Sequence, residues 1–319
     1  MKGTGCTVKG VCGKEPEVAN LQDLLIWILK GISYWGVRAR EIGVTDVETG
    51  LYVAEGLFTT ITNVDFDSES LGEKIERALE ARERIERLFK EGFRRKHGKD
   101  FDDPVPEACT WKLSGGLEVY EMKGAEVGVL NTSDEDIRSL RELLTYGLKG
   151  IAAYTDHAYI LKHSDNSILD FLQEALAACL DDSRTVDDYV SLVLKAGEFA
   201  VKAMALLDEA NTGSYGNPEI SSVFTGTVEG PGILVSGHDL LDLEELLKQT
   251  EGKGINIYTH GEMLPANAYP GLKKFSHLKG NFGTSWYNQQ KEFEEFRGPI
   301  LMTTNCIQKP RESYKEKIF

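Results

Sequence analysis

The sequence predicts a multidomain chain in which an all-α domain precedes a partial Rossmann-like α/β domain with a parallel sheet. Two observations predict this order. From Val18 to about Leu207, apolar residues recur with the period of helices, and one helical pattern occurs twice. From residue 232 onwards, short runs rich in Ile and Val alternate with helical stretches, which is typical of βαβ units. We therefore place a helical domain at 1–212 and an α/β domain at 213–319.

Length, charge and cysteine content restrict the class of protein. A chain of 319 residues is long enough for two or three domains and for a core that needs no disulfides. The net charge of −15 argues against a nucleic-acid surface. The sequence contains no run of about 18 apolar residues, so no membrane span is predicted. The residues after Met1 do not form the apolar region of a secretory signal. With an odd number of cysteines, five, these features predict a cytoplasmic protein that uses thiols for metal or redox chemistry.

The five cysteines differ in their surroundings. Residues 3–14 form a glycine-rich loop that carries Cys6 and Cys12, and such glycines let backbone N–H groups approach the sulfurs of an iron–sulfur cluster. Two cysteines with five residues between them are a weak signal, so a loop with free thiols is an equally good interpretation. Cys179 is predicted to be a core residue of an apolar helix, and Cys109 is also predicted to be structural.

The helical domain is predicted to contain two copies of a three-helix bundle, at 18–97 and 133–208. Residues 21–32 align with residues 140–151 at an offset of 119. At the same offset, three apolar positions of the first copy meet apolar positions of the second: Leu71 falls on Val190, Ile75 on Leu194 and Leu88 on Leu207. Three helical segments repeated in the same order imply two copies of one bundle.

Local signals predict where these helices begin and end. Capping boxes, in which a hydroxyl and a carboxylate satisfy free backbone N–H groups, are predicted to start helices at Ser70 and Thr132. Residues 98–131 are predicted to be a connector with a small hairpin, because residues 117–120 resemble a strand. The turn-rich residues 208–218 are predicted to follow the last helix and to separate the two domains.

Three apolar runs of the α/β domain end in possible metal ligands. His238 follows the first run, His260 and Glu262 follow the second, and Cys306 follows the third. Because ligands of parallel sheets bind beyond the carboxyl ends of the strands, His238, Glu262 and Cys306 are predicted to face one cavity. Taken singly, each residue also has an ordinary structural interpretation, as a loop histidine, a glutamate at a helix N-terminus or a buried thiol.

The three types of side chain favour one kind of metal centre. Structural zinc sites prefer four Cys or His ligands, whereas an imidazole, a carboxylate and a thiolate together suit iron in a mixed sulfur and oxygen environment. The residues alone therefore predict a redox or Lewis-acid metal centre. A zinc protein that uses the same residues is a weaker hypothesis.

Five stretches of the chain resemble the hybrid-cluster protein family, also called hydroxylamine reductases, which is related to the carbon monoxide dehydrogenases. They are residues 4–14, 206–211, 236–240, 258–267 and 303–306, and the similarity covers essentially the whole chain. The resemblance implies two three-helix bundles followed by two α/β domains. It also implies a cubane 4Fe-4S cluster, and a hybrid cluster of the 4Fe-2S-2O type held by one His, two Glu and four Cys.

The matching motifs imply which residues of this chain bind each cluster. Cys6 and Cys12 match the last two cysteine ligands of the 4Fe-4S cluster, while His238, Glu262 and Cys306 match the first three ligands of the hybrid iron–sulfur–oxygen cluster. His260 is a candidate for a group that supports these ligands or relays protons.

The resemblance also implies a reaction and its partners. Hydroxylamine is the expected small nitrogen-oxide substrate and is reduced to ammonia and water, with nitric oxide as the alternative substrate. An unidentified electron donor is expected to supply the cubane cluster. The parent protein is expected to be a monomeric cytoplasmic enzyme of nitrosative stress that binds no nucleic acid and no membrane.

Two departures from the family pattern lead to an alternative function. The first Cys-x-x-Cys of the family should precede Thr4, where this chain has Met1-Lys2-Gly3. The chain also ends at Phe319, where family members continue. We therefore expect a fragment of a longer enzyme, and the alternative is a non-catalytic apo module or one half of a scaffold that needs the missing C-terminal region. Bound iron and a visible colour distinguish the enzyme from this module.

Overall fold

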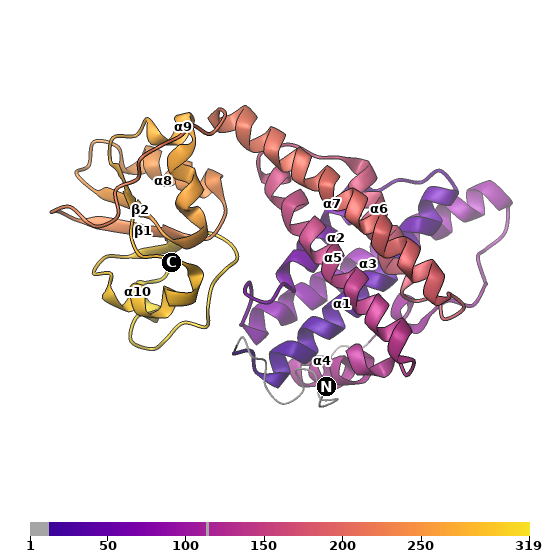
Figure 1. Cartoon of the computed structure of the whole chain (residues 1–319). Coiled ribbons are helices and arrows are strands. Elements are labelled where there is room, and N and C mark those ends of the chain that lie inside the picture. Colours follow the sequence, from indigo (N-terminus) through magenta and orange to yellow (C-terminus); the bar gives the residue numbers. More distant parts are fainter. Residues whose placement is uncertain (1–12, 113–114) are drawn as a thin grey trace. The chain divides into compact units, whose positions relative to one another are not determined.

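The computed structural model describes residues 13–112 and 115–319. The chain divides into two compact units, which we call the helical unit (residues 1–156 and 164–206) and the sheet unit (residues 157–163 and 207–319). Figure 1 shows the helices of the first unit and the strands of the second. The predicted order, an all-α part followed by an α/β part, is confirmed. None of the described helices is long and apolar enough to cross a membrane.

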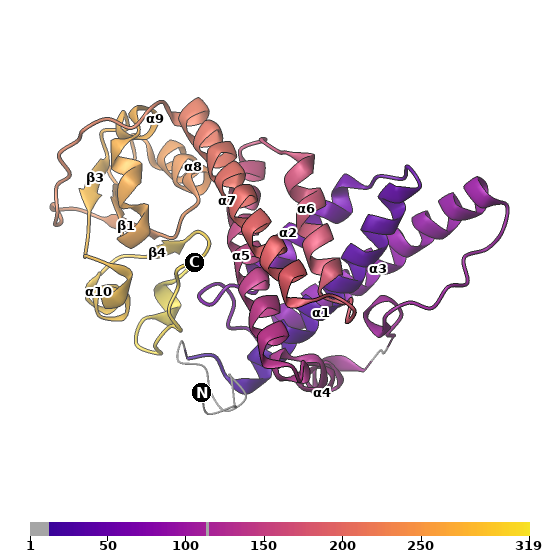
Figure 2. The same cartoon turned by 45° about the vertical axis from the view of Figure 1, so that its right-hand side comes forward.

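Within the described residues, six long helices form two sets of three (Figure 2). The first set is α1 (Pro16–Glu41), α2 (Val47–Thr59) and α3 (Ser68–His97), and the second is α5 (Glu135–Ile160), α6 (Asn166–Ala178) and α7 (Val186–Tyr215). In both sets the helices have 26, 13 and 30 residues. The predicted offset of 119 therefore relates α1 to α5 and α2 to α6 residue by residue.

The register predicted for the third helix of the repeat is wrong by one residue. The loop before α7 is one residue shorter than the loop before α3, so the first residues of these helices, 68 and 186, differ by 118. At this offset the buried Leu71 falls on Tyr189, which is also buried. At an offset of 119 it falls on Val190, which is 42% exposed. One residue turns a helix face by about 100°, so the single deletion changes which side chains face the core.

Aspartates start the helices at which capping boxes were predicted, so those two predictions are wrong. Asp67 caps α3 by accepting hydrogen bonds from the N–H groups of Glu69 (2.9 Å) and Ser70 (3.4 Å), which places Ser70 inside the helix. Asp134 caps α5 in the same way, with the N–H of Ile137 at 2.9 Å. A carboxylate satisfies the free N–H groups and also interacts favourably with the positive end of the helix dipole.

The predicted end of the last helix is also wrong. Residues 208–215 continue α7, and the helix ends at Gly216, whose φ of +82° is a conformation that glycine adopts at little cost. The turn-forming residues of this stretch are tolerated inside the helix, where Thr212 donates its hydroxyl to the Asp208 carbonyl at 2.7 Å.

The connector between the two sets is helical, so the predicted hairpin is wrong. It contains η1 (Glu107–Cys109), α4 (Gly116–Val127) and η2 (Val129–Asn131), and it covers the first set of helices. The buried Arg82 of α3 donates to the carbonyls of Ala108 and Trp111. Trp35 of α1 donates its ring N–H to the carbonyl of Cys109 at 3.2 Å. Cys109 is fully buried, as its predicted structural role requires.

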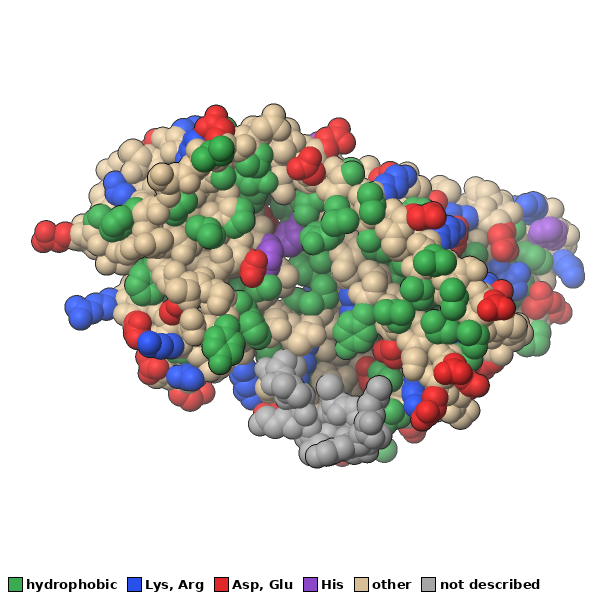
Figure 3. Space-filling view, in the orientation of Figure 1, with side chains coloured by type: hydrophobic (Ala, Val, Ile, Leu, Met, Phe, Trp, Pro, Cys, Tyr) green, Lys and Arg blue, Asp and Glu red, His purple; other side chains and the backbone are tan. Residues whose placement is uncertain are grey.

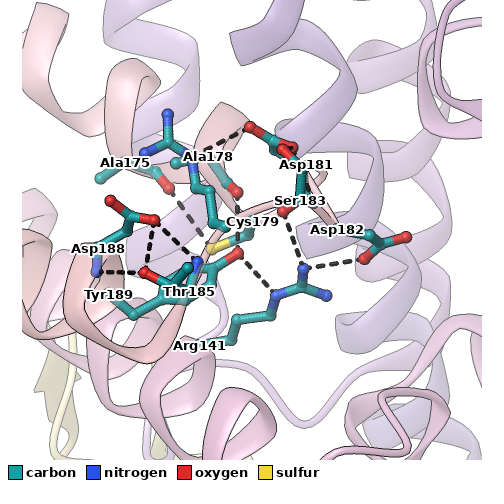
Figure 4. Close-up of polar contacts among 11 residues, drawn as sticks. Arg141, Ala175, Ala178, Cys179, Asp181, Asp182, Ser183, Thr185, Asp188 and Tyr189 are labelled. Atoms are coloured by element: carbon teal, nitrogen blue, oxygen red, sulfur yellow. Dashed lines mark hydrogen bonds and ion pairs between the residues drawn. The ribbon is translucent and has the colours of Figure 1, made fainter.

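In the second set, Arg141 of α5 holds the turn between α6 and α7 (Figure 4). Its Nε donates to the Tyr189 hydroxyl at 2.8 Å, and its Nη2 lies 2.9 Å from the Asp182 carboxylate. The buried Cys179 lies at the same turn and donates its thiol to the Ala175 carbonyl at 3.4 Å. Its predicted place in the core is confirmed.

The sheet unit contains four parallel strands in the order β3-β2-β1-β4. The strands are β1 (Gly232–Ser236), β2 (Asn256–Thr259), β3 (Leu278–Asn281) and β4 (Ile300–Met302). Leu234 and Val235 point to opposite faces of β1 and both are fully buried, as expected of a parallel sheet with both faces covered. The covering and connecting elements are α8 (Leu240–Thr250), η3 (Gly261–Ala268), α9 (Pro270–Lys273), η4 (Trp286–Asn288), α10 (Gln289–Glu295) and η5 (Lys315–Lys317).

The two sets of helices offer a matched pair of glycines, Gly31 and Gly150, which the offset of 119 makes equivalent. A Cβ atom at Gly31 would lie 2.1 Å from the Ala108 carbonyl oxygen, whereas one at Gly150 would have no atom of the described residues within 4 Å. Gly31→Ala is expected to lower the free energy of unfolding by about 1–3 kcal/mol through this overlap. Gly150→Ala is expected to raise it by up to about 1 kcal/mol through helix propensity. Urea unfolding followed by circular dichroism measures both changes in unfolding free energy. Changes of the same sign would contradict the inference that the connector packs on Gly31 but not on Gly150.

Candidate metal centre

The predicted ligands lie at one edge of the sheet. β1 pairs in parallel with β2 on one side and β4 on the other, so the carboxyl ends of the three strands are neighbours. His238 follows β1, Glu262 follows β2 in η3, and Cys306 follows β4.

The structure brings His238 and Cys306 together. The Cys306 Sγ lies 3.8 Å from the His238 Nε2. Cys306 has a φ of +67°, which side-chain-bearing residues rarely adopt. Gly237, with a φ of +104°, allows the β1 loop to touch the β4 loop, because a Cβ atom there would lie 2.4 Å from the Thr303 Oγ1. The two donor atoms therefore meet only because both loops accept unusual backbone conformations.

Two threonine hydroxyls fasten these loops to each other. Thr304 Oγ1 accepts the N–H of His238 at 3.2 Å. Thr303 Oγ1 accepts the N–H of Asp239 at 3.2 Å and donates to the Ser236 carbonyl at 3.2 Å. The Asp239 carboxylate then caps α8, at 2.8 Å from the N–H of Leu241. The β4 loop thus fixes the backbone of His238 at the start of a helix.

Gln289 of α10 holds the loop of Cys306 with both ends of its amide group. Its Nε2 donates to the Cys306 carbonyl at 2.7 Å, and its Oε1 accepts the N–H of Gln308 at 2.7 Å. The side chain is 1% exposed, so these bonds are shielded from water. We infer that the left-handed conformation of Cys306 depends on this amide.

His260 is fully buried, and its two ring nitrogens face other groups than the predicted ligands. Its Nε2 lies 2.9 Å from the Glu292 carboxylate and its Nδ1 lies 3.0 Å from the Ser236 hydroxyl. Burial lowers the pKa of His260, and Glu292 only partly offsets this effect. Burial raises the pKa of Glu292, but hydrogen bonds from Thr284 and His260 outweigh it and lower this pKa. The His260 ring is therefore neutral, donates a hydrogen bond to Glu292 and accepts one from Ser236. These two hydrogen bonds link β1, β2 and α10.

Charge and burial set the protonation of the predicted ligands in the metal-free chain. Burial lowers the pKa of His238, partly offset by the charge of Glu262. Burial raises the pKa of the Cys306 thiol to about 11, and Glu262 adds to this effect. Glu262 itself is exposed. At neutral pH the site thus presents an imidazole lone pair, a protonated thiol and a nearby carboxylate.

Two further residues, His157 and Asn305, lie at the site, and His157 carries no recognisable signal in the sequence. His157, in the last turn of α5 and part of the sheet unit, has its ring centre 6.3 Å from that of His238. Burial lowers the pKa of His157, while Asp239 and the Asn305 side chain act in the opposite direction. The Asn305 amide also lies 3.9 Å from the Cys306 Sγ. Asn305 precedes Cys306 within the stretch 303–306, whereas His157 is distant from the motifs along the chain, so only folding brings His157 to the site.

The predicted ligand set fits a metal group only in part. Within residues 13–112 and 115–319, no three His, Cys, Asp or Glu side chains converge closely enough to form a metal site. His238 nevertheless has a buried Nδ1 that makes no hydrogen bond within this described part of the chain. The His238 Nε2 faces the Cys306 thiol, and the charge of Glu262 raises the pKa of both groups. The donor types therefore suit a mixed nitrogen, sulfur and oxygen site, and Cys6 and Cys12 lie outside the described residues.

A second polar region lies in the helical unit, in a cavity of about 380 Å³ lined by residues that include Asp23, Lys30 and Glu142. Burial raises the pKa of Asp23 to about 6 and lowers the pKa of Lys149 to about 8. The Lys149 ammonium donates to the Thr60 carbonyl at 3.1 Å, which links the two sets of helices. We assign this region a structural role.

Comparison with known proteins is consistent with a metal-containing class. Residues 2–319 match the Prismane/CO dehydrogenase family, and the chain belongs to this family. The resemblance found in the sequence is thereby confirmed.

The chain is similar to several proteins named hydroxylamine reductase. It is 71% identical over 319 residues to that of Kosmotoga olearia, 64% over 318 residues to that of Thermosipho melanesiensis and 61% over 320 residues to that of Petrotoga mobilis. Each match covers 100% of this chain but only 57%, 58% and 59% of the respective relative. The chain therefore spans less than two thirds of the length of the curated relatives it matches.

The carboxyl of Asp23 predicts a pH dependence of stability. Its pKa is 3.8 ordinarily and about 6 in the folded chain, so the folded state holds the proton more tightly. The contribution of Asp23 to stability is thus largest below pH 3.8 and is lost as the pH rises through about 6. Relative to Asp23→Asn, the native chain should lose about 2–3 kcal/mol of unfolding free energy between about pH 4 and pH 7. Urea unfolding at several pH values measures this difference, with the exposed Asp102→Asn as control; a constant difference would contradict it.

Removal of the Gln289 amide should loosen the loop of Cys306. Gln289→Leu leaves a buried carbonyl and N–H without partners, which is expected to cost about 1–3 kcal/mol of unfolding free energy. Alkylation of Cys306 by iodoacetamide, followed by peptide mass spectrometry, should become several-fold faster. Gln289→Glu keeps the acceptor for Gln308 and should give an intermediate rate, while the exposed Lys291→Leu on the same helix is the control. An unchanged rate in Gln289→Leu would refute the proposed role of the amide.

Proposed function

We propose that this chain forms part of an iron–sulfur oxidoreductase that reduces hydroxylamine to ammonia and water. The observation that carries the proposal is the approach of the His238 imidazole and the Cys306 thiol to 3.8 Å at one sheet edge. The names of the longer relatives support the choice of substrate. The proposal includes a cytoplasmic location, an unidentified electron donor and nitric oxide as another possible small nitrogen-oxide substrate.

The residues that would hold the metal groups follow from the site and the matching motifs. His238, Glu262 and Cys306 would bind a hybrid iron–sulfur–oxygen cluster, and Cys6 and Cys12 a 4Fe-4S cluster. When bound, these groups supply the two electrons that cleave the N–O bond, while two protons complete ammonia and water. Further ligands would come from polypeptide that has no counterpart here.

The described residues prepare the donor atoms for metal. The lowered pKa of His238 keeps its imidazole neutral, which leaves a lone pair for a metal ion. The Cys306 thiol, with its pKa of about 11, must release a proton when it becomes a ligand. Metal binding is therefore expected to weaken as the pH falls. Thr303, Thr304 and Gln289 hold both loops in place before metal arrives, which reduces the entropy cost of forming the site.

The contacts of His260 support a positioning role. Both ring nitrogens are used within the sheet unit, by Ser236 and Glu292, so the ring is not free to exchange protons with a substrate. The ring fixes the end of β2, from which the exposed Glu262 projects.

A second candidate function is a non-catalytic module that another polypeptide completes. It is favoured by the convergence of only two donor atoms, His238 Nε2 and Cys306 Sγ, within the described residues. A site of this kind would hold a metal group only after a partner supplied further ligands.

Metal analysis after purification without oxygen separates these functions. The enzyme proposal predicts more than one iron and acid-labile sulfide per chain, with a visible absorption band. His238→Ala and Cys306→Ala should each lower the iron content, because each removes one donor atom, whereas His97→Ala at the exposed end of α3 should not. A chain that binds no iron would contradict catalysis by these residues alone. Stoichiometric zinc without colour would instead support a zinc site.

A further inference from the structure

The second set of helices presents an apolar surface to solvent. We call it the α5–α7 face. It consists of Leu143, Tyr146, Gly150 and Tyr154 of α5 and Val190, Leu194 and Val201 of α7. Leu143, Leu194 and Val201 are 57%, 68% and 62% exposed. Figure 3 shows hydrophobic side chains over the part of the helical unit where these two helices lie.

The two helices contribute to one continuous face. The Cβ position of Gly147 lies 3.9 Å from the Cβ of Ala196, so α5 and α7 touch beside the exposed residues. On α5 these residues recur at intervals of three or four, which places them on one side of the helix. Contiguous apolar surface of this kind marks interaction sites in soluble proteins.

The first set of helices shows what covers the equivalent surface. At the offset of 119, the α5 residues of the face correspond to Leu24, Trp27, Gly31 and Trp35 of α1. Leu24 and Trp35 are almost fully buried. The connector lies over them, with the Ala108 carbonyl against Gly31 and the Trp111 ring 6.0 Å from the Trp27 ring.

In the part of the chain that the structure describes, the second set keeps the same pattern of side chains without this cover. A Cβ atom at Gly150, the counterpart of Gly31, would meet no atom of residues 13–112 or 115–319 within 4 Å. The segment that follows α7, in the place where the connector follows α3, is bound to the sheet unit instead. There the N–H of Glu219 donates to the Ala268 carbonyl at 2.9 Å and that of Gly226 to the Asn281 carbonyl at 3.3 Å.

The α7 side of the face also differs from its counterpart in α3. At the offset of 118, Leu194 and Val201 correspond to Glu76 and Glu83, which are exposed and charged. At these two positions the first set therefore carries exposed carboxylates, and the second set carries aliphatic side chains. Since burying such side chains is favourable, the α5–α7 face is suited to a partner surface.

We propose that the α5–α7 face binds a polypeptide segment from the part of the longer relatives that has no counterpart in this chain. That part amounts to 43% of the Kosmotoga olearia protein, since the match covers 57% of it. The segment takes the role that the connector has in the first set. Its apolar side chains pack beside Leu143 and Leu194, and its backbone crosses at Gly150, where no side chain prevents the approach. This inference does not depend on the reaction at the metal centre.

Thiol labelling at the face tests the proposal. Leu143→Cys and Leu194→Cys are introduced into this chain and at the aligned positions of the Kosmotoga olearia protein, and maleimide labelling is followed by peptide mass spectrometry. In this chain both thiols should react at the rate of an exposed cysteine. In the longer protein they should react at least ten-fold more slowly. Glu83→Cys on α3 is the matched control and should react equally fast in both proteins.

The outcomes separate the possible occupants. Equal labelling of both proteins at the face would overturn the proposal. Slow labelling in this chain itself, together with a doubled mass in light scattering, would show that a second copy covers the face and would also overturn it. A second variant provides a test that does not depend on thiol labelling. Leu194→Glu should leave the urea unfolding midpoint of this chain unchanged and lower that of the longer protein. A midpoint unchanged in both would contradict the docking segment.

Discussion

The parallel pairing of β1 with both β2 and β4 is the constraint on which the candidate metal centre depends. Each strand delivers one predicted ligand at its carboxyl end, and these ends are neighbours only because β1 lies between the other two. An antiparallel strand at either position would direct its following loop to the opposite edge of the sheet. Gln289 and Glu292 of the short helix α10 then fix the loops after β4 and β2 through buried hydrogen bonds.

Burial at this edge has a cost that the surrounding polar groups offset. It keeps the Cys306 thiol protonated and the His238 imidazole neutral when no metal is bound, because charged groups are poorly solvated there. It also requires that Gln289, Ser236 and Glu292 find partners, and each of them does. These contacts hold the loops without a metal, so at the proposed site the donor types, and not loop closure, would carry the specificity for a metal group.

The internal repeat shows how one helical pattern serves two surroundings. Helices of equal length occur in both sets, and the same aromatic and glycine positions line α1 and α5. The first set is covered by its own connector, with the Ala108 carbonyl against Gly31. In the second set the segment after α7 is bound to the sheet unit, and the equivalent surface stays exposed. Within the described residues, the two copies of one helical pattern thus differ in what covers them.

The sequence by itself determined the order of helices and parallel strands, the offset of 119 that relates α1 to α5, and the place of His238, Glu262 and Cys306 after the strands. These features follow from periodicity and local spacing, which neighbouring residues encode. Tertiary structure alone decided the phase of α7, the helix at 116–127 and the aspartate caps, since each depends on competition between near-equivalent local signals. It also decided that Gln289, Glu292 and His157 belong to the site. Their contacts join residues that lie far apart in the chain, and such pairings leave no local pattern for the sequence to reveal.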